Sequence, residues 1–97
     1  MNIELVARDV VVNDEVQKRV EEKLGKILER AHQDTGVRVT LENEAGLFSA
    51  LINMGVKGKD IVSQSQNESM LAAIDEAISK TERQFKKHQD KLRARGR

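Results

Sequence analysis

Apolar residues recur at helical spacing along two segments of the chain, and the first of these segments follows Asn13. Its apolar positions are mostly three or four residues apart: Val16, Val20, Leu24, Ile27, Leu28 and Ala31. Such a stripe predicts an amphipathic helix of about five turns over residues 14–31. The side-chain oxygen of Asn13 is suited to cap its first turn, and Asp14 and Glu15 complement the positive end of the helix dipole.

A second apolar stripe runs through the C-terminal third of the chain. Its positions are Leu71, Ile74, Ile78, Thr81, Phe85 and Leu92. No proline interrupts residues 68–93, so the pattern predicts one long helix. Either Asn67 or Ser69 can serve as its N-cap, because both side chains carry an oxygen that accepts a hydrogen bond from the first turn.

Four other segments show the alternation or the short apolar runs that are typical of strands. They cover residues 2–12, 37–42, 47–56 and 61–66. Glycine-containing turns are expected at residues 34–36, 44–46 and 55–60. The order β-α-β-β-β-α predicts an α+β fold, in which a four-stranded, mainly antiparallel sheet has two helices packed on one face, a dsRBD-like arrangement.

Length and composition predict one domain over residues 1–97, because 97 residues can build one core. The sequence contains no cysteine, which excludes disulfides and thiolate metal sites. Neither a secretory signal nor an apolar stretch near the roughly 18 residues of a membrane span is visible. We therefore expect a soluble cytoplasmic protein that uses no cofactor and contacts no membrane.

The net charge of +1 hides a strong asymmetry along the chain. Residues 1–79 carry nine basic and 14 acidic groups, a net of −5, whereas residues 80–97 carry eight basic and two acidic groups, a net of +6. A cationic end of this kind indicates a surface for a polyanion, because neutralising phosphates releases condensed counterions. The alternative is a solvated basic tail without a ligand.

The basic residues form two rows when the helices are drawn at about 100° per residue. The first row is Arg19, Lys23, Lys26 and Arg30, and the second is Lys80, Arg83, Lys87 and Lys91. We expect the rows to form one extended patch or a groove that binds RNA phosphates. The alternative is a solvated face with ion pairs, for example between Arg19 and Glu15 or Glu22. Aromatic residues do not alternate with the basic ones, so recognition is expected to rest on RNA backbone and shape.

Other polar motifs have simpler structural explanations. Gly55-Val56-Lys57-Gly58 matches the GxxG pattern of KH domains, but its place between two strands predicts a hairpin turn. His32 and His88 lack the spacing of metal ligands. The serines at positions 63, 65 and 69 lack a neighbouring base, so we expect neither a metal site nor an enzyme.

A protein-interaction module is the second functional hypothesis. A sheet covered by helices on one side leaves its other face, or an edge, available for a second copy of the chain. In this hypothesis four residues give the open face an apolar surface: Leu47, Phe48, Ile52 and Met54. The alternative is that the apolar side of this strand belongs to the core.

Two segments of the predicted second helix resemble a known family. SMLAAID at residues 69–75 and RQFKKHQDKL at residues 83–92 are similar to the second helix of ribosome hibernation promoting factors, which belong with the ribosome-associated inhibitor and sigma-54 modulation proteins. The predicted element order and the length match over essentially the whole chain. The resemblance implies binding in the decoding region of the small ribosomal subunit. There it would block mRNA and tRNA sites and so inhibit translation on idle ribosomes under stress.

The resemblance also implies contact residues and partners. The candidate RNA-binding residues, which would face ribosomal RNA, are Lys23, Lys26, Arg30, Lys80, Arg83, Lys86, Lys87 and Lys91. Long family members carry a C-terminal dimerisation domain, so this chain looks like a short form. It would be a monomer off the ribosome and would need a second hibernation factor to pair ribosomes. Leu71, where an aromatic residue is usual, and Gln89, where a lysine is common, depart from the family pattern.

Overall fold

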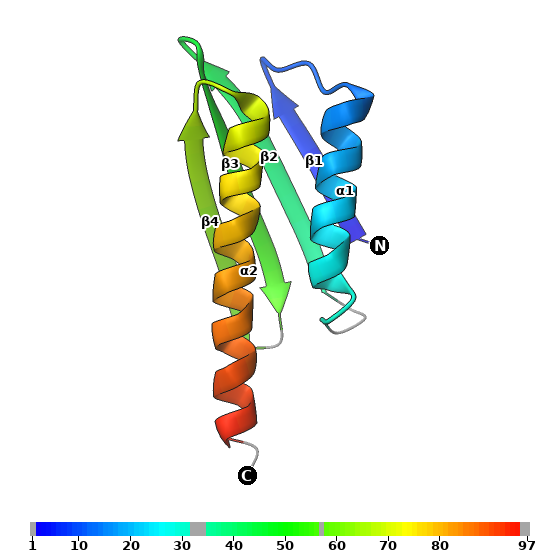
Figure 1. Cartoon of the computed structure of the whole chain (residues 1–97), viewed down its shortest axis with the longest axis vertical. Coiled ribbons are helices and arrows are strands. Elements are labelled where there is room, and N and C mark those ends of the chain that lie inside the picture. The colour runs from blue at the N-terminus through cyan, green and yellow to red at the C-terminus, as the bar shows by residue number, and fades with distance from the viewer. Residues whose placement is uncertain (1, 32–34, 57, 96–97) are drawn as a thin grey trace.

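The computed structural model describes residues 2–31, 35–56 and 58–95, and the side chains of residues 3–31, 35–56 and 58–91. Its elements (Figure 1) are β1 (Asn2–Arg8), α1 (Asp14–Leu28), β2 (Gly36–Glu44), β3 (Leu47–Val56), β4 (Lys59–Asn67) and α2 (Met70–Arg95). This order confirms the α+β fold predicted from the sequence. Three predictions fall outside the described residues, namely the role of His32, the conformation of Lys57 and the burial of the Leu92 side chain.

The four strands form one sheet in the order β1-β2-β3-β4. β1 and β2 run parallel because α1 connects them, whereas hairpins join β2, β3 and β4 as antiparallel neighbours. In the first hairpin Ala45 and Gly46 have φ angles of +53° and +84°, the two left-handed conformations that a type I′ turn requires. Gly58, with φ of +81°, lies between β3 and β4, and Val56 pairs with Lys59, so the predicted hairpin between these two strands is present.

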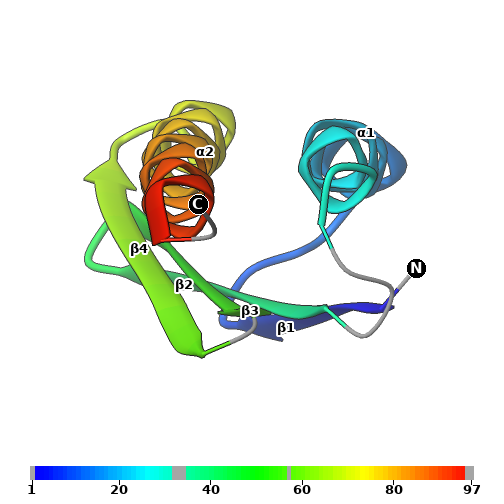
Figure 2. The same cartoon turned by 90° about the horizontal axis from the view of Figure 1, so that it is seen from below.

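Both helices lie on the same face of the sheet (Figure 2), and the core lies between the two layers. Alternate residues of a strand point to the same side of the sheet, so Val37, Val39 and Leu41 of β2 all point toward the helices. The other buried apolar residues are Val16, Val20, Leu24 and Ile27 of α1, Ala50, Ile52 and Met54 of β3, Ile61 of β4, and Ala73, Ile74, Ala77, Ile78 and Phe85 of α2.

The open face of the sheet is not the apolar surface that the second hypothesis required. Ile52 and Met54 are 1% and 0% exposed and lie in the core. Phe48 is on the same side of β3, because it is an even number of residues away from both. The assignment of these three residues to the open face was therefore wrong, and the alternative considered from the sequence, that the apolar side of this strand belongs to the core, is confirmed. Leu47 is 39% exposed and lies on the opposite side of the strand.

Two elements end earlier than predicted, for local reasons. β1 ends at Arg8 and not at residue 12, because Asp9 has φ of +56°, a left-handed conformation that interrupts the extended chain. α1 ends at Leu28 and not at Ala31. The Ala31 amide donates to the Leu28 carbonyl at 3.0 Å. Backbone hydrogen bonds there join residues three apart, as in a 3₁₀ turn, and no longer four apart, so the α-helix stops.

Side-chain caps fix where both helices begin, as the sequence predicted. Asn13 Oδ1 accepts a hydrogen bond from the Val16 amide at 2.9 Å. Ser69 caps α2, since its Oγ accepts from the Ala72 amide at 3.3 Å. Asn67, the other proposed cap, supports the turn before α2 by accepting from the Ser69 amide at 2.9 Å. These bonds satisfy amides that the first helical turns leave without backbone partners.

Candidate nucleic-acid interface

The basic row of α1 faces α2 and meets a carboxylate there. Nη1 of Arg19 donates to Oδ2 of Asp75 at 2.9 Å, and Nζ of Lys23 lies 3.0 Å from the other oxygen of Asp75. Arg19 therefore pairs across the two helices and not with Glu15 or Glu22, the partners considered from the sequence. Asp75 holds two cations of the row and links α1 to α2.

A second carboxylate binds the end of the same row. Nη2 of Arg30 donates to Oε2 of Glu82 at 3.0 Å, and the guanidinium carbon lies 5.9 Å from the centre of the Phe85 ring. Nε2 of Gln89 donates to the backbone oxygen of Arg30 at 3.2 Å, so the glutamine at this position joins α2 to the end of α1. Lys26 is exposed and forms no ion pair within the described part of the chain.

The basic row of α2 begins on the side of that helix that faces β4. Nζ of Lys80 donates to the backbone oxygen of Gln64 at 2.8 Å. Gln84, one turn later, donates to the backbone oxygen of Val62 and to Oγ of Ser63, both at 3.0 Å. The side of α2 that faces α1 carries Asp75 and Glu82. These two carboxylates lie between the two predicted rows, so the rows do not form one continuous patch.

Four further cations among the described side chains of α2 are exposed and have no carboxylate partner in the described ranges. Arg83, Lys86, Lys87 and Lys91 form no ion pair with any other residue of the described ranges. A positive field thus extends along the second half of this helix.

Lysines from β4 and α2 line one hollow, and we name Lys59, Lys87 and Lys91 the distal basic cluster. The hollow has a volume of about 320 Å³, and its lining also includes Gln84, His88 and Asp90. Three ammonium groups against one carboxylate make this a positively charged recess, which favours an anion such as a phosphate. Lys59 was missed from the sequence, because its place in a turn gives no sign that it approaches a helix some 28 residues later.

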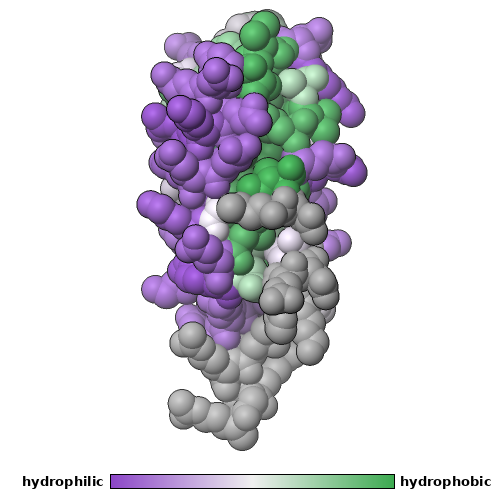
Figure 3. Space-filling view, turned by 90° about the vertical axis from the view of Figure 1, so that its right-hand side faces the viewer, coloured by the Kyte–Doolittle hydropathy of each residue, from purple (hydrophilic) through white to green (hydrophobic). Residues whose placement is uncertain are grey.

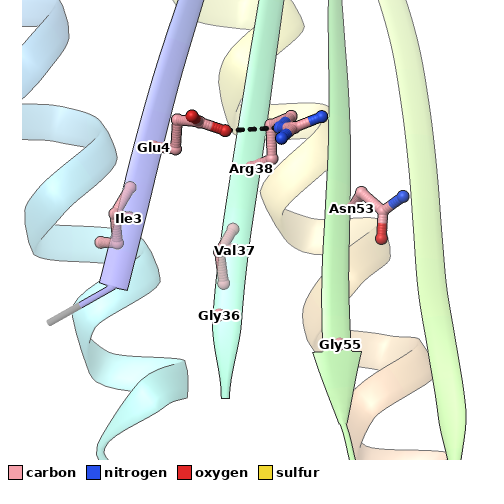
Figure 4. A pocket seen from close by; sticks show the side chains of 7 residues that line it. All are labelled: Ile3, Glu4, Gly36, Val37, Arg38, Asn53 and Gly55. Carbon is pink, nitrogen blue, oxygen red and sulfur yellow. Dashed lines mark hydrogen bonds and ion pairs between the residues drawn. The ribbon is translucent and has the colours of Figure 1, made fainter. Parts of the chain in front are cut away.

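A larger hollow lies on the open face of the sheet (Figure 4), and its charges cancel. Its volume is about 560 Å³, and it is lined by Ile3, Glu4, Gly36, Val37, Arg38, Asn53 and Gly55. The two glycines are paired neighbours on β2 and β3, so the space exists because neither has a side chain. Nε of Arg38 donates to Oε1 of Glu4, which neutralises both groups. The hollow therefore lacks the net charge of the distal basic cluster.

Within the described ranges, no group of His, Cys, Asp or Glu side chains is placed to hold a metal ion. Serines 63 and 65 are buried on the core side of β4, and Ser69 caps α2. No helix among the described residues has the length and apolar character needed to cross a membrane. The feature of the molecule with distinctive chemistry is therefore the cationic half of α2 together with Lys59.

Comparison with known proteins gives consistent matches over nearly the whole chain. The sequence model of the sigma 54 modulation protein / S30EA ribosomal protein family matches residues 3–93. The ribosome hibernation promoting factor of Pseudomonas putida is 29% identical over 91 residues, which are 94% of this chain and 89% of the relative. That of Escherichia coli strain K12 is 28% identical over 93 residues, which are 96% of this chain and 98% of the relative.

Solved structures share the arrangement of Figure 1. The N-terminal domain of Protein Y from Thermus thermophilus is similar with a TM-score of 0.81 at 28% identity, over 91% of this chain and 99% of that one. A ribosomal subunit interface protein from Coxiella burnetii has a TM-score of 0.78 at 18% identity, over 93% of this chain and 99% of that one. At 18% identity the second likeness supports the fold alone.

Proposed function

Because the chain belongs to the sigma 54 modulation protein / S30EA ribosomal protein family, as its second helix predicted, we propose that it binds the small ribosomal subunit and inhibits translation. It occupies the decoding region and blocks the sites of mRNA and tRNAs on idle ribosomes. It acts in the cytoplasm by occupancy, without an enzymatic step or a cofactor. The relatives described above are named ribosome hibernation promoting factors, which supports this proposal.

The observation that carries the proposal is the group of exposed cations on the second half of α2, which have no carboxylate partner among the described residues. Binding RNA phosphates releases condensed counterions, and this release drives association. A cation that is already held by a protein carboxylate must first lose that partner. Cations without such a partner therefore contribute most to RNA binding.

The ion pairs of the candidate residues support a ranking within the proposed site. We propose that ribosomal RNA contacts the eight residues named from the sequence, Lys23, Lys26, Arg30, Lys80, Arg83, Lys86, Lys87 and Lys91, and also Lys59. The exposed cations of α2 and Lys59 contribute most to phosphate binding. Lys23 and Arg30 contribute less, because each must exchange Asp75 or Glu82 for a phosphate.

The test is the double variant Lys87→Gln, Lys91→Gln, measured by co-sedimentation with purified small subunits across a range of salt. Each phosphate contact changes the slope of log K against log salt by about 0.7 to 0.9, so losing two contacts makes the slope shallower by roughly 1.5. At about 0.1 M salt the affinity should fall roughly 10- to 100-fold. Thermal unfolding should not change, because both side chains are exposed and unpaired within the described residues.

A matched control removes the same amount of charge elsewhere. Lys18→Gln together with Arg38→Gln also lowers the net charge by two, but Lys18 lies on the exposed side of α1 and Arg38 on the open face of the sheet. This control should bind as the unmodified chain does. Equal losses in the two double variants would show that net charge alone drives binding, and the assigned site would be wrong.

The proposal includes partners and stoichiometry. One copy binds each small subunit, and pairing of whole ribosomes requires a second hibernation factor. Quantitative co-sedimentation with saturating protein should therefore give one chain per subunit. Ribosome dimers should not form with this chain alone, and their formation in sucrose gradients without another factor would contradict this part.

A further inference from the structure

The two edge strands of the sheet, β1 and β4, differ in how far other elements cover their backbone. At the β4 edge, α2 donates side-chain hydrogen bonds to backbone oxygens: Lys80 to Gln64 at 2.8 Å and Gln84 to Val62 at 3.0 Å. Figures 1 and 2 show α2 lying along this side of the sheet. The β4 edge is therefore partly closed to another strand.

The β1 edge has no such cover in the described part of the chain. β1 pairs with β2 on one side, and no described side chain hydrogen-bonds to the β1 backbone on the other. An uncovered edge strand presents a row of free amide and carbonyl groups, which can pair with a further strand. The side chains of β1 determine which strand can pair with this edge.

The sequence of β1 is complementary to itself about Val6. If a second copy of β1 runs antiparallel with Val6 opposite Val6, then Glu4 of one copy lies opposite Arg8 of the other. In the same register Leu5 lies opposite Ala7 on the helix side of the sheet. Opposite charges in directly facing positions stabilise an antiparallel pair, as do apolar neighbours.

The charged pairs already present on the sheet extend this complementarity. Within one chain Arg8 lies 3.5 Å from Glu42, and Arg38 donates to Glu4. Across the junction the open face would carry Glu42, Arg8, then Glu4 and Arg38 of the second copy. Signs alternate along this row, so Glu4 of each copy would lie between Arg38 of its own chain and Arg8 of the other.

Apolar surface next to the edge also favours cover by a second copy. Figure 3 looks at the molecule from the side of α1 and β1 and shows an apolar band between polar regions. Ile3, Leu5 and Val12 are only partly buried against the core, and Val11 is 85% exposed. A second β1 with its own α1 would remove part of this band from water.

We propose that the chain self-associates through antiparallel β1–β1 pairing, which joins two sheets into one of eight strands with all helices on one face. Seven residues per strand make a small interface, below the roughly 800 Å² per partner of stable complexes, so the dimer is weak. It forms off the ribosome at high concentration, where the family resemblance implied a monomer, and it does not depend on the proposed function.

The experiment is sedimentation equilibrium of the full chain, without RNA, from roughly 10 μM to about 1 mM. The mean mass should rise toward twice the chain mass. Val6→Lys and Val6→Glu should each remain monomeric, because like charges then face each other at the two-fold axis. An equal mixture of these two variants should dimerise again, because opposite charges then meet. General loss of folding would not be rescued by mixing.

The matched control is Val62→Lys. Val62 is 50% exposed on the other edge strand, and α2 occupies the backbone there, so this variant should dimerise as the unmodified chain does. A monomer throughout the concentration range would overturn the proposal. So would equal losses in Val6→Lys and Val62→Lys, or a mixture of the two Val6 variants that stays monomeric.

Discussion

Neutralising the carboxylates between the helices should strengthen RNA binding while it weakens the fold. The double variant Asp75→Asn, Glu82→Gln removes the partners of Arg19, Lys23 and Arg30, whose nitrogens lie 2.9 to 3.0 Å from carboxylate oxygens. Asp75 and Glu82 lie on the side of α2 that faces the first basic row of α1. Release of the three cations would make the space between α1 and α2 cationic.

The two effects have different sizes. The side chains in these pairs are between 34% and 56% exposed, so each pair contributes only about 0.2 to 1 kcal/mol to stability. A total loss of roughly 1 kcal/mol lowers the unfolding temperature of a domain this size by about 4 to 8 °C. If all three released cations contact phosphates, the slope of log K against log salt steepens by about 2 to 3.

Co-sedimentation with small subunits over a salt series measures the binding effect, and calorimetry measures the unfolding temperature. The double variant should bind more tightly than the unmodified chain at low salt and lose this advantage as salt rises. An unchanged slope with an intact fold would mean that the first basic row does not contact RNA. Weaker binding with an intact fold would mean that the carboxylates themselves take part, which refutes the reasoning.

Two further pairs of variants test single residues. Lys59→Gln should make the salt slope of small-subunit binding shallower by about 0.7 to 0.9 without changing unfolding, whereas Lys18→Gln should leave the slope unchanged. Ser65 is 5% exposed and its hydroxyl has no hydrogen-bond partner among the described residues, so Ser65→Ala should be neutral or stabilising by up to about 1 kcal/mol in urea unfolding. Ser63→Ala should destabilise instead, because it leaves the Gln84 amide without that acceptor; the opposite order for the two serines would contradict this.

Patterns confined to one element were enough to predict most of the fold. The alternation of Val37, Val39 and Leu41 defined a half-buried strand, and the stripe from Val16 to Ile27 defined the buried side of α1. Caps could also be predicted, since a capping side chain acts on amides two or three residues away. The end of β1 could not, because the left-handed conformation of Asp9 has no signal in the apolar pattern.

Relations between elements were harder to predict. A helical wheel shows that Lys23 and Arg30 share one side of α1, but not which residues of the other helix meet them. Asp75 and Glu82 were therefore overlooked as partners. Similarly, Phe48, Ile52 and Met54 define one apolar side of β3, but this pattern alone does not tell whether that side packs against the helices or against a second copy of the chain. The packing partner of this side depends on how the strands pair and where the helices lie. The sequence of a single strand does not specify either.

The central claim is that cations of α2 and β4 bind the phosphate backbone of small-subunit RNA. The most direct measurement is the affinity of the unmodified chain for purified small subunits as a function of salt. Several simultaneous phosphate contacts predict a log–log slope of about −3 to −5. A slope near zero, or no co-sedimentation at low salt, would contradict the account.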